Sequence, residues 1–242
     1  MSGAAVAIIQ ARVGSTRLPR KALLDVAGAT LLARVVERVK RASRVDVVVV
    51  ATTRLPEDDA VVTEATTLGV QVYRGDVEDV LARYAGAARE FGADPVVRIT
   101  SDCPLIDPGV IDEVVGALGR ADFAANTLDR TFPRGLDVEV ATRGALEVAD
   151  AEAREPYERA HVMPFIYRRP DRFRLVSIRS DVDYADLRWT VDTAEDLEFV
   201  SAVYARLDTG LESWHEIVDL LEREPRLLEL NRSVTQKPLE AG

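Results

Sequence analysis

Short runs of aliphatic and β-branched residues alternate along the chain with stretches in which apolar residues recur every three or four positions. Four runs, at residues 6–9, 45–51, 70–73 and 96–100, are typical of buried strands. Pro56 and the acidic residues after it indicate a helix start between the second and third runs. The other two connections carry helical apolar stripes: Leu31, Leu32, Val35, Val36 and Val39, then Val80, Leu81, Tyr84, Ala88 and Phe91. This order predicts an α/β fold, a mostly parallel Rossmann-like sheet with helices on both faces.

The alternation weakens between residues 124 and 186. Candidate strands there cover residues 136–140 and 174–178, with a helix near 151–167. We interpret this region as a small, partly antiparallel sub-lobe over a cleft or at a subunit contact. A strand is then expected at 187–191, followed by a helix at 194–206 that Thr193 and Asp196 open as a capping box. We therefore expect a main domain at 1–210, and a C-terminal helix with a polar tail at 211–242.

Polar residues follow the predicted parallel strands where each strand ends. Such ends lie on one edge of a parallel sheet, and open α/β sheets bind ligands there. Turn chemistry accounts for each loop singly, but four loops in register indicate a common cleft. The residues in question are the loop 11–21, Thr52 and Thr53, the segment 74–76, and Ser101 with Asp102.

The loop from Ala11 to Lys21 is strongly basic in an acidic protein. The chain has a formal charge of −10, yet no carboxylate precedes Asp25. Concentrated cations in such a loop indicate a polyphosphate site, although a solvated basic turn is the alternative. Gly14 is expected to adopt a positive φ and admit a ligand close to the backbone, while Ser15 and Thr16 add hydroxyl donors. The cations are Arg12, Arg17, Arg20 and Lys21.

Several classes of protein do not fit the sequence. It lacks a Walker A loop and a Gly-x-Gly-x-x-Gly motif after a strand. A pI near 4.9 argues against a nucleic-acid partner. One cysteine, Cys103, excludes an internal disulfide and fits a reducing compartment. The first apolar stretch is broken by Gln10, so we expect neither a signal peptide nor a membrane span, and a cytoplasmic location.

Two aspartates are candidate metal ligands. Asp102 and Asp192 each end a predicted strand, and two such acids can share one Mg²⁺ ion with substrate phosphates and water. The alternative is a helix cap at Asp192 and a turn former at Asp102. Asp107, directly before Pro108, is the predicted cap of another helix.

Cys103 and the histidines are weaker candidates. We favour a small buried thiol over a nucleophile at Cys103, because no histidine with a partner lies near it in the sequence. His215 falls on a charged terminal helix and is expected at the surface. For His161 we favour a structural hydrogen bond over a role in chemistry.

Four sequence blocks together resemble the CMP-sugar synthetase cytidylyltransferases, which include the acylneuraminate and Kdo enzymes. The resemblance is strongest to the spore-coat polysaccharide biosynthesis branch, and it continues to Asn231-Arg232-Ser233. The blocks are Ala11-Arg12-x-Gly-Ser-Thr-Arg17-Leu-Pro-x-Lys21, then Gly75-Asp76-x-Glu78-Asp79-Val80-Leu81-x-Arg83-Tyr84, then Arg98-x-Thr-Ser-Asp102-Cys-Pro-Leu-Ile-Asp107, and finally Leu187-Arg188-Trp189-Thr-Val-Asp192-Thr.

The resemblance implies a GT-A-like nucleotidyltransferase fold, CTP as donor, a small-molecule acceptor, Mg²⁺ as cofactor and a homodimer. It implies that Arg12 and Lys21 bind the triphosphate while Asp102 and Asp192 bind the metal, so these four are the expected catalytic residues. An acceptor oxygen would attack the α-phosphorus and release pyrophosphate. The implied nucleotide contacts are Ala11, Arg12, Gly14, Ser15, Lys21, Thr52, Arg74, Thr100 and Ser101, and the implied acceptor contacts are Asp137, Glu139 and His161.

Two other functions remain open at this point. A glycosyltransferase would share the fold and bind a nucleotide sugar, but the density of cations after the first strand favours a triphosphate. A non-catalytic nucleotide-binding subunit is disfavoured, because both candidate acids and both loop cations are retained. The acceptor stays open between an eight- or nine-carbon keto-sugar acid, another sugar and a phosphonate.

Overall fold

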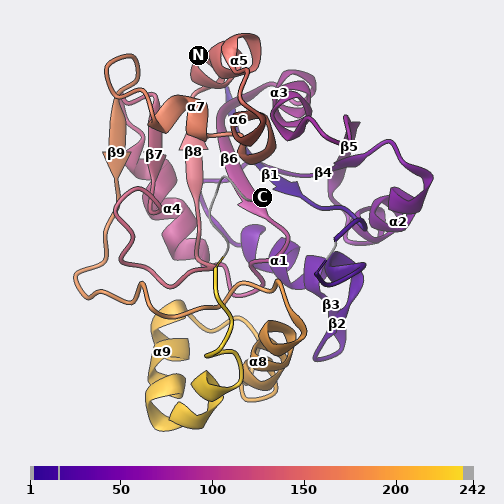
Figure 1. Cartoon of the computed structure of the whole chain (residues 1–242), viewed down its shortest axis with the longest axis vertical. Helices are drawn as coiled ribbons and strands as arrows, with labels where there is room; N and C mark the ends of the chain where they lie inside the picture. Colours follow the sequence, from indigo (N-terminus) through magenta and orange to yellow (C-terminus); the bar gives the residue numbers. More distant parts are fainter. Residues whose placement is uncertain (1–2, 16, 237–242) are drawn as a thin grey trace.

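One seven-stranded sheet runs through the centre of the protein, as the computed structural model shows for residues 3–15 and 17–236 (Figure 1). Its strand order is β5-β4-β1-β6-β8-β7-β9. β8 is antiparallel to both of its neighbours, and every other pair of adjacent strands is parallel. The strands are β1 (Ala4–Gln10), β4 (Val47–Thr53), β5 (Gln71–Gly75), β6 (Ala93–Thr100), β7 (Phe123–Ala125), β8 (Glu139–Ala141) and β9 (Leu175–Ser177).

Helices cover both faces of this sheet and separate its apolar residues into two clusters. On one face lie α1 (Leu31–Val39), α2 (Asp59–Thr67), α4 (Pro108–Ala117), α8 (Ala194–Tyr204) and α9 (Trp214–Arg223). On the other lie α3 (Val80–Glu90), α5 (Arg143–Glu152), α6 (Pro156–His161) and α7 (Pro164–Tyr167). Short elements complete the chain: η1 (Lys21–Leu23), η2 (Pro56–Asp58), η3 (Pro225–Glu229) and the hairpin of β2 (Asp25–Val26) and β3 (Ala29–Thr30).

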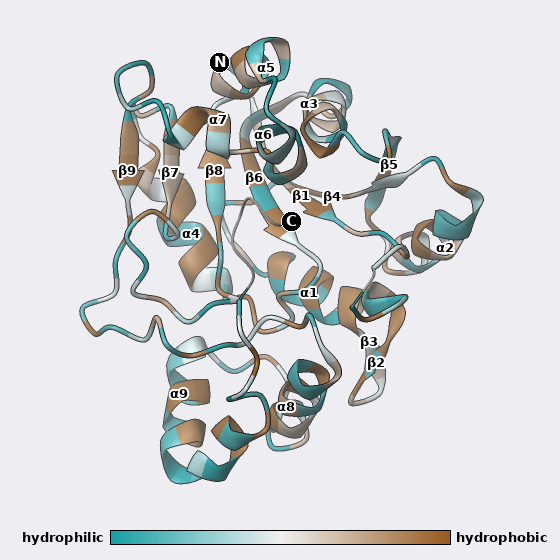
Figure 2. Cartoon of the chain, in the orientation of Figure 1, coloured by the Kyte–Doolittle hydropathy of each residue, from teal (hydrophilic) through white to brown (hydrophobic). Residues whose placement is uncertain are grey.

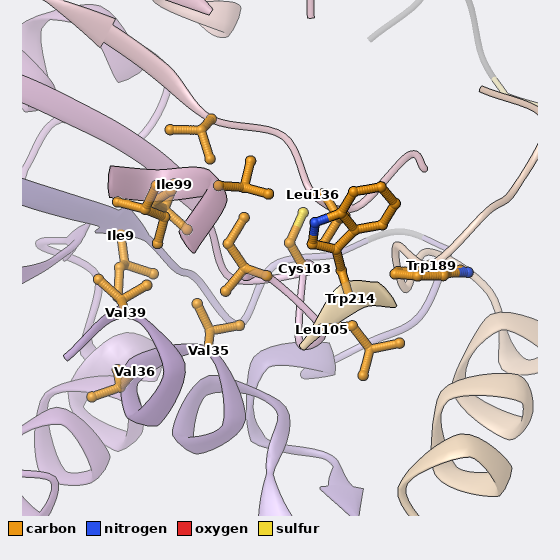
Figure 3. Packing of buried hydrophobic residues seen from close by; sticks show 14 of the residues in the cluster. Ile9, Val35, Val36, Val39, Ile99, Cys103, Leu105, Leu136, Trp189 and Trp214 are labelled. Carbon is orange, nitrogen blue, oxygen red and sulfur yellow. The ribbon is translucent and has the colours of Figure 1, made fainter. Parts of the chain in front are cut away.

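The period of two along β1 divides its side chains between the two clusters. Ala7 and Ile9 pack on the α1 side, while Val6 and Ile8 pack on the α3 side. In Figure 2 the central strands are largely brown, whereas α3 and α9 carry both brown and teal, as expected for helices with one buried side. Figure 3 shows the α1 side, where Trp214 of α9 lies beside Leu136 and Cys103. The C-terminal helix therefore belongs to the same core as the sheet.

The four predicted parallel strands and both apolar helical stripes are confirmed, with shifts of a few residues at their ends. The region at 124–186 is partly antiparallel, as expected, and its strands extend the main sheet. The single helix predicted near 151–167 is wrong. Pro156 and Pro164 each start a new helix, because proline is tolerated in a first turn and interrupts a helix interior.

The strand predicted at 187–191 is also wrong. Among the described residues this segment makes one isolated parallel bridge, between Arg188 and Arg134. Its remaining backbone bonds go to loops: the amide of Val191 donates to the carbonyl oxygen of Asp102 at 2.8 Å. The segment is apolar enough for a strand, but its neighbours in space are turns and supply no continuous ladder.

No helix in the described part of the chain is long and apolar enough to cross a membrane. The proposed cytoplasmic location and homodimer stay predictions.

Asp107 joins α4 to α9 through one carboxylate, and its predicted capping role is confirmed. Oδ1 accepts the amide of Val110 at 3.1 Å, and Oδ2 accepts the buried amide of Trp214 at 2.9 Å. We expect Asp107→Ala to lower the free energy of unfolding by about 2–4 kcal/mol, because a lost cap costs about 1 kcal/mol and an unsatisfied buried amide about 1–3 kcal/mol.

Urea unfolding of both the wild type and the variant measures this effect. Thr142→Ala is the matched control, because Thr142 caps α5 and its side chain accepts only the amide of Ala145 within the described structure. An equal loss of stability in the two variants would contradict the joining role of Asp107.

Candidate active site

Lys21, Asp102 and Asp192 meet at the C-terminal edge of the parallel strands. The Nζ atom of Lys21 lies 2.9 Å from Oδ2 of Asp102, 2.9 Å from Oδ1 of Asp192 and 3.1 Å from the carbonyl oxygen of Val191. Asp102 follows β6, Asp192 precedes α8, and Lys21 begins η1. The structure thus brings three predicted site residues together, from segments separated by 81 and 171 positions.

Arginines and a hydroxyl group fix the orientation of both carboxylates. Oδ1 of Asp102 accepts the Thr100 hydroxyl, and Oδ2 of Asp192 accepts the Arg188 guanidinium at 3.0 Å. Arg17 reaches Oδ1 of Asp192 at 3.0 Å. Asp192 is not the cap of α8, because the cap is Thr193, whose hydroxyl accepts the amide of Asp196 at 3.3 Å. The capping box is therefore confirmed, and the capping alternative for Asp192 is wrong.

Charges within this cluster stabilise one another. Burial alone would lower the pKa of Lys21, but the two carboxylates outweigh it and raise the pKa above its ordinary value. Burial would raise the pKa of Asp102, but Lys21 and the Thr100 hydrogen bond bring it down to about 2. At neutral pH the cluster therefore contains a charged ammonium group and an ionised Asp102 carboxylate.

Cys103 is a buried thiol, as predicted. It is 2% exposed, and its burial, reinforced by the charge of Asp102, raises the pKa of the thiol well above its ordinary value. A protonated, buried sulfur is a poor nucleophile. This placement argues against covalent chemistry at Cys103.

The two aspartates provide a donor set that fits Mg²⁺. Carboxylate oxygens are hard ligands, and Mg²⁺ usually takes one or two carboxylates together with phosphate oxygens and water. Both acids already face one cation, Lys21, from separate elements. Within residues 3–15 and 17–236, no group of three or more His, Cys, Asp and Glu side chains is arranged to hold a metal. The pair fits an ion shared with a substrate better than a closed structural site.

An open cavity of about 280 Å³ lies over this edge of the sheet. Two of the three predicted acceptor residues, Asp137 and His161, line it together with Asp102 and Asp192. Glu139, the third, is not among the lining residues, because its carboxylate pairs with Arg98 in a buried position on β8. The other lining residues are Gln10, Arg17, Arg98, Thr100, Cys103, Arg134, Thr190 and Gln236.

The predicted nucleotide residues of the basic loop lie outside this cavity. Arg12 is exposed, and its guanidinium donates only to the carbonyl oxygen of Val77, at 3.5 Å, within the described structure. Ala11 is buried beside β4, and the Ser15 hydroxyl accepts the amide of Leu18 at 3.4 Å. Thr16 lies outside the described residues. Arg12 is thus placed to receive an anion.

The expectation of a positive φ at Gly14 is wrong. The left-handed residue of this loop is Arg20, with φ 57°. Space around Gly14 is open, since an added Cβ would meet only the Glu57 carboxylate, at 3.7 Å. The sequence rule favours glycine for such a turn, but the turn falls at the entry to η1.

The other predicted nucleotide residues differ in what they can offer a ligand. Thr52 at the end of β4 is fully buried, and its hydroxyl has no partner in the described structure. Ser101 is buried, and its amide donates to Gln10. Arg74 is committed elsewhere, because its guanidinium pairs with Asp59 at 2.6 Å and donates to two backbone carbonyl groups. The structure does not bring Arg74 to the cavity.

Arg83 is a buried cation to which the sequence analysis assigned no role. It is 2% exposed, its Nε atom has no partner, and within the described residues it forms no ion pair. Its Nη1 atom donates to the carbonyl oxygen of Asp76 at 3.0 Å. Burial lowers its pKa and the charge of Arg12 lowers it further, while Asp58 and Asp76 offset only part of this effect. Arg83 lies three residues after Val80 and therefore on the apolar side of α3. A charged residue on the apolar side of a helix is the sequence feature that could have indicated a buried functional cation. Arg83 of α3 therefore adds a positive charge near Arg12 of the basic loop.

Fold and site together define a nucleotidyltransferase. The family described as "Cytidylyltransferase" matches residues 6–236. The chain belongs to this cytidylyltransferase family. The expected GT-A-like nucleotidyltransferase fold is confirmed.

Three similar proteins illustrate the range of the family. A solved structure of a cytidylyltransferase from Leptospira borgpetersenii matches with a TM-score of 0.90 and 34% identity, covering 97% of this chain and 100% of that one. The spore coat polysaccharide biosynthesis protein SpsF of Bacillus subtilis is 30% identical over 90% of this chain and 94% of its own. A 3-deoxy-manno-octulosonate cytidylyltransferase of Anaeromyxobacter dehalogenans is 31% identical over 82% of this chain and 96% of its own.

Replacing Lys21 by methionine tests the electrostatics of the cluster. We expect the pKa of Asp102 to rise from about 2 to its ordinary value of 3.8 or above, because burial and Asp192 then act without a compensating cation. The stability contributed by the depressed pKa is present above pH 3.8 and is lost as the pH falls towards 2.

Carboxyl NMR titration of Asp102 measures this change. Lys40→Met is the control, because Lys40 is exposed and bonds only the carbonyl oxygen of Leu68 in the described structure. An unaltered Asp102 titration in Lys21→Met would show that the ion pair does not set the charge of the site.

Proposed function

We propose that this enzyme transfers CMP from CTP to a sugar acid in a Mg²⁺-dependent reaction that releases pyrophosphate. The observation that carries the proposal is the cluster of Lys21, Asp102 and Asp192 between a basic loop and an open cavity. Family membership supports cytidylyl transfer. A relative named as a 3-deoxy-manno-octulosonate cytidylyltransferase supports a sugar acid as acceptor.

The cationic residues would bind and neutralise the triphosphate. Arg12 has no ion pair within the described residues, and the buried charge of Arg83 lies close enough to lower the cost of holding an anion. Lys21 sits at the junction of the loop and the two acids, where it would stabilise negative charge developing on the leaving pyrophosphate.

The acceptor would enter from the cavity side. Its hydroxyl oxygen would form a bond to the α-phosphorus and release its proton to solvent. The bond from that phosphorus to the bridging oxygen would break, and pyrophosphate would leave with the electron pair. Such transfers depend mainly on positioning and on charge neutralisation, so no protein nucleophile is required. Mg²⁺ held by Asp102 and Asp192 would neutralise phosphate charge and acidify the attacking hydroxyl.

The depressed pKa of Asp102 gives this residue a defined part in the proposal. With a pKa of about 2, its carboxylate stays ionised across the neutral range and is a weak base. A permanent anion suits a metal ligand better than a proton acceptor. We propose a preference for CTP over ATP, which membership of the cytidylyltransferase family supports.

Arg12→Ala tests triphosphate binding by the basic loop. We expect turnover with CTP to fall roughly 10²-fold or more, the scale for losing one preorganised charge-stabilising donor. Arg20→Ala is the matched control, since Arg20 is an exposed cation of the same loop that is not among the nucleotide contacts implied by the family resemblance. Pyrophosphate release measures both variants. Equal losses would indicate a general effect of loop charge, and a wild-type rate for Arg12→Ala would remove this residue from the site.

Joint metal binding by the two acids is tested with Asp102→Asn, Asp192→Asn and the double variant. Each is assayed over a range of Mg²⁺ concentrations. We expect severe single defects and a double defect well short of their product, because residues that act as a unit are non-additive. Asp186→Asn is the charge-matched control, because Asp186 is exposed. Near-normal activity with unchanged Mg²⁺ dependence in either single variant would exclude that residue as a ligand.

A further inference from the structure

Arg134 differs from the other arginines around the cavity. It lines the cavity and is half-buried, yet its guanidinium makes no ion pair or hydrogen bond within residues 3–15 and 17–236. Its cationic neighbours all have carboxylate partners: Arg17 pairs with Asp192, Arg98 with Glu139, Arg130 with Asp137, and Arg188 with Asp192 and Asp196.

The surroundings of Arg134 penalise its charge. Burial lowers the pKa of the guanidinium, and the nearby cations Arg130 and Arg188 lower it further. The carboxylates of Asp137 and Asp192 raise it but only partly offset these effects, so the pKa stays below its ordinary value. Arginine nevertheless keeps its proton in proteins, so the group remains a cation. A half-buried charge without a partner is costly, and such a cost is commonly met where a ligand supplies the missing charge.

Backbone contacts hold Arg134 against the segment that leads to Asp192. Its amide donates to Leu187 at 2.9 Å, and its carbonyl oxygen accepts the amide of Trp189 at 2.7 Å. The next residue, Gly135, has φ 111°, and a Cβ there would lie 2.7 Å from the amide nitrogen of Thr190. Only glycine permits this close approach. Arg134 and Asp192 are therefore held by the same local frame.

Other charges on the cavity wall are already balanced. Asp102 and Asp192 face Lys21, and both oxygens of Asp137 accept the Arg130 guanidinium. Among the arginine, aspartate and glutamate side chains that line the cavity in the described structure, Arg134 is the one without an oppositely charged partner. A guanidinium fork matches the two oxygens of a carboxylate, and such bidentate bonds are strong and directional.

We propose that Arg134 binds the carboxylate of the acceptor and selects sugar acids over neutral sugars. This inference rests on the proposed cytidylyl transfer and specifies how its acceptor is recognised. The carboxylate is the non-reacting anchor, while the reacting hydroxyl lies toward the pair of aspartates. Arg134 is then a specificity-determining residue.

The experiment compares Arg134→Gln and Arg134→Lys with the wild type. The probes are an eight-carbon and a nine-carbon keto-sugar acid and their neutral amides, assayed by pyrophosphate release with saturating CTP and by calorimetric binding. Arg179→Gln is the control, because Arg179 is exposed and lies outside the cavity.

We expect the wild type to use at least one acid far better than its amide. In Arg134→Gln the KM for that acid should rise roughly 30-fold or more, the scale for a lost charge-assisted hydrogen-bonded pair, while the KM for CTP stays within about twofold. In Arg134→Lys the KM for the acid should lie between the values of the wild type and of Arg134→Gln, because lysine keeps the positive charge but cannot form the bidentate pair of a guanidinium group. The thermal midpoint of Arg134→Gln should be unchanged or higher, since an unpaired charge is removed.

Preserved preference for the acid in Arg134→Gln, equal use of acid and amide by the wild type, or no binding of either acid would each overturn the proposal. A lower thermal midpoint with parallel losses for CTP and acceptor would instead assign Arg134 a structural role and overturn it as well. Failure of the underlying function looks different: CTP would not bind, or pyrophosphate would not be released with any acid or neutral sugar.

Discussion

The ammonium group of Lys21 stands between the carboxylates of Asp102 and Asp192, and the site is organised around this contact. It joins the loop after the first strand, the end of β6 and the segment before α8, which come from distant parts of the chain. Two carboxylates this close would repel each other without a cation. In the free protein, the positive charge of Lys21 compensates the two carboxylates. The Mg²⁺ ion that we propose for the complex with substrate is also positive and would compensate the same two groups.

The charged residues around this contact are also compensated in pairs. Arg188 links Asp192 to Asp196, and Asp196 also completes the capping box of α8, so the start of a helix and the orientation of a candidate metal ligand depend on the same side chains. Arg130 neutralises Asp137 in the same way. Against this balanced background, Arg12, Arg83 and Arg134 form no ion pair within residues 3–15 and 17–236, and we propose that anionic groups of the nucleotide and of the acceptor bind near them.

Backbone geometry at the cavity is set by contacts that are not part of a regular strand. The segment at 187–191 is held by one isolated bridge and by bonds to loops, and Gly135 allows the facing loop to approach it closely. Thr190 of this segment and Asp192 directly after it both line the cavity.

Local sequence patterns by themselves determined the four parallel strands and the helices between them, the caps at Asp107 and Thr193, the basic loop, and the expectation that Asp102 and Asp192 share one edge. These features depend on neighbours a few residues apart, for which periodicity and capping rules hold. The same patterns did not predict the irregular segment at 187–191 or the separate helices α6 and α7. Only the tertiary structure decided which cation faces which acid, that Arg74 is already bonded, and that Arg20 rather than Gly14 takes the left-handed turn. It also decided that the guanidinium group of Arg134 has no partner among the described residues. Ion pairing depends on distances between groups separated by up to 171 positions, and local patterns do not encode such distances.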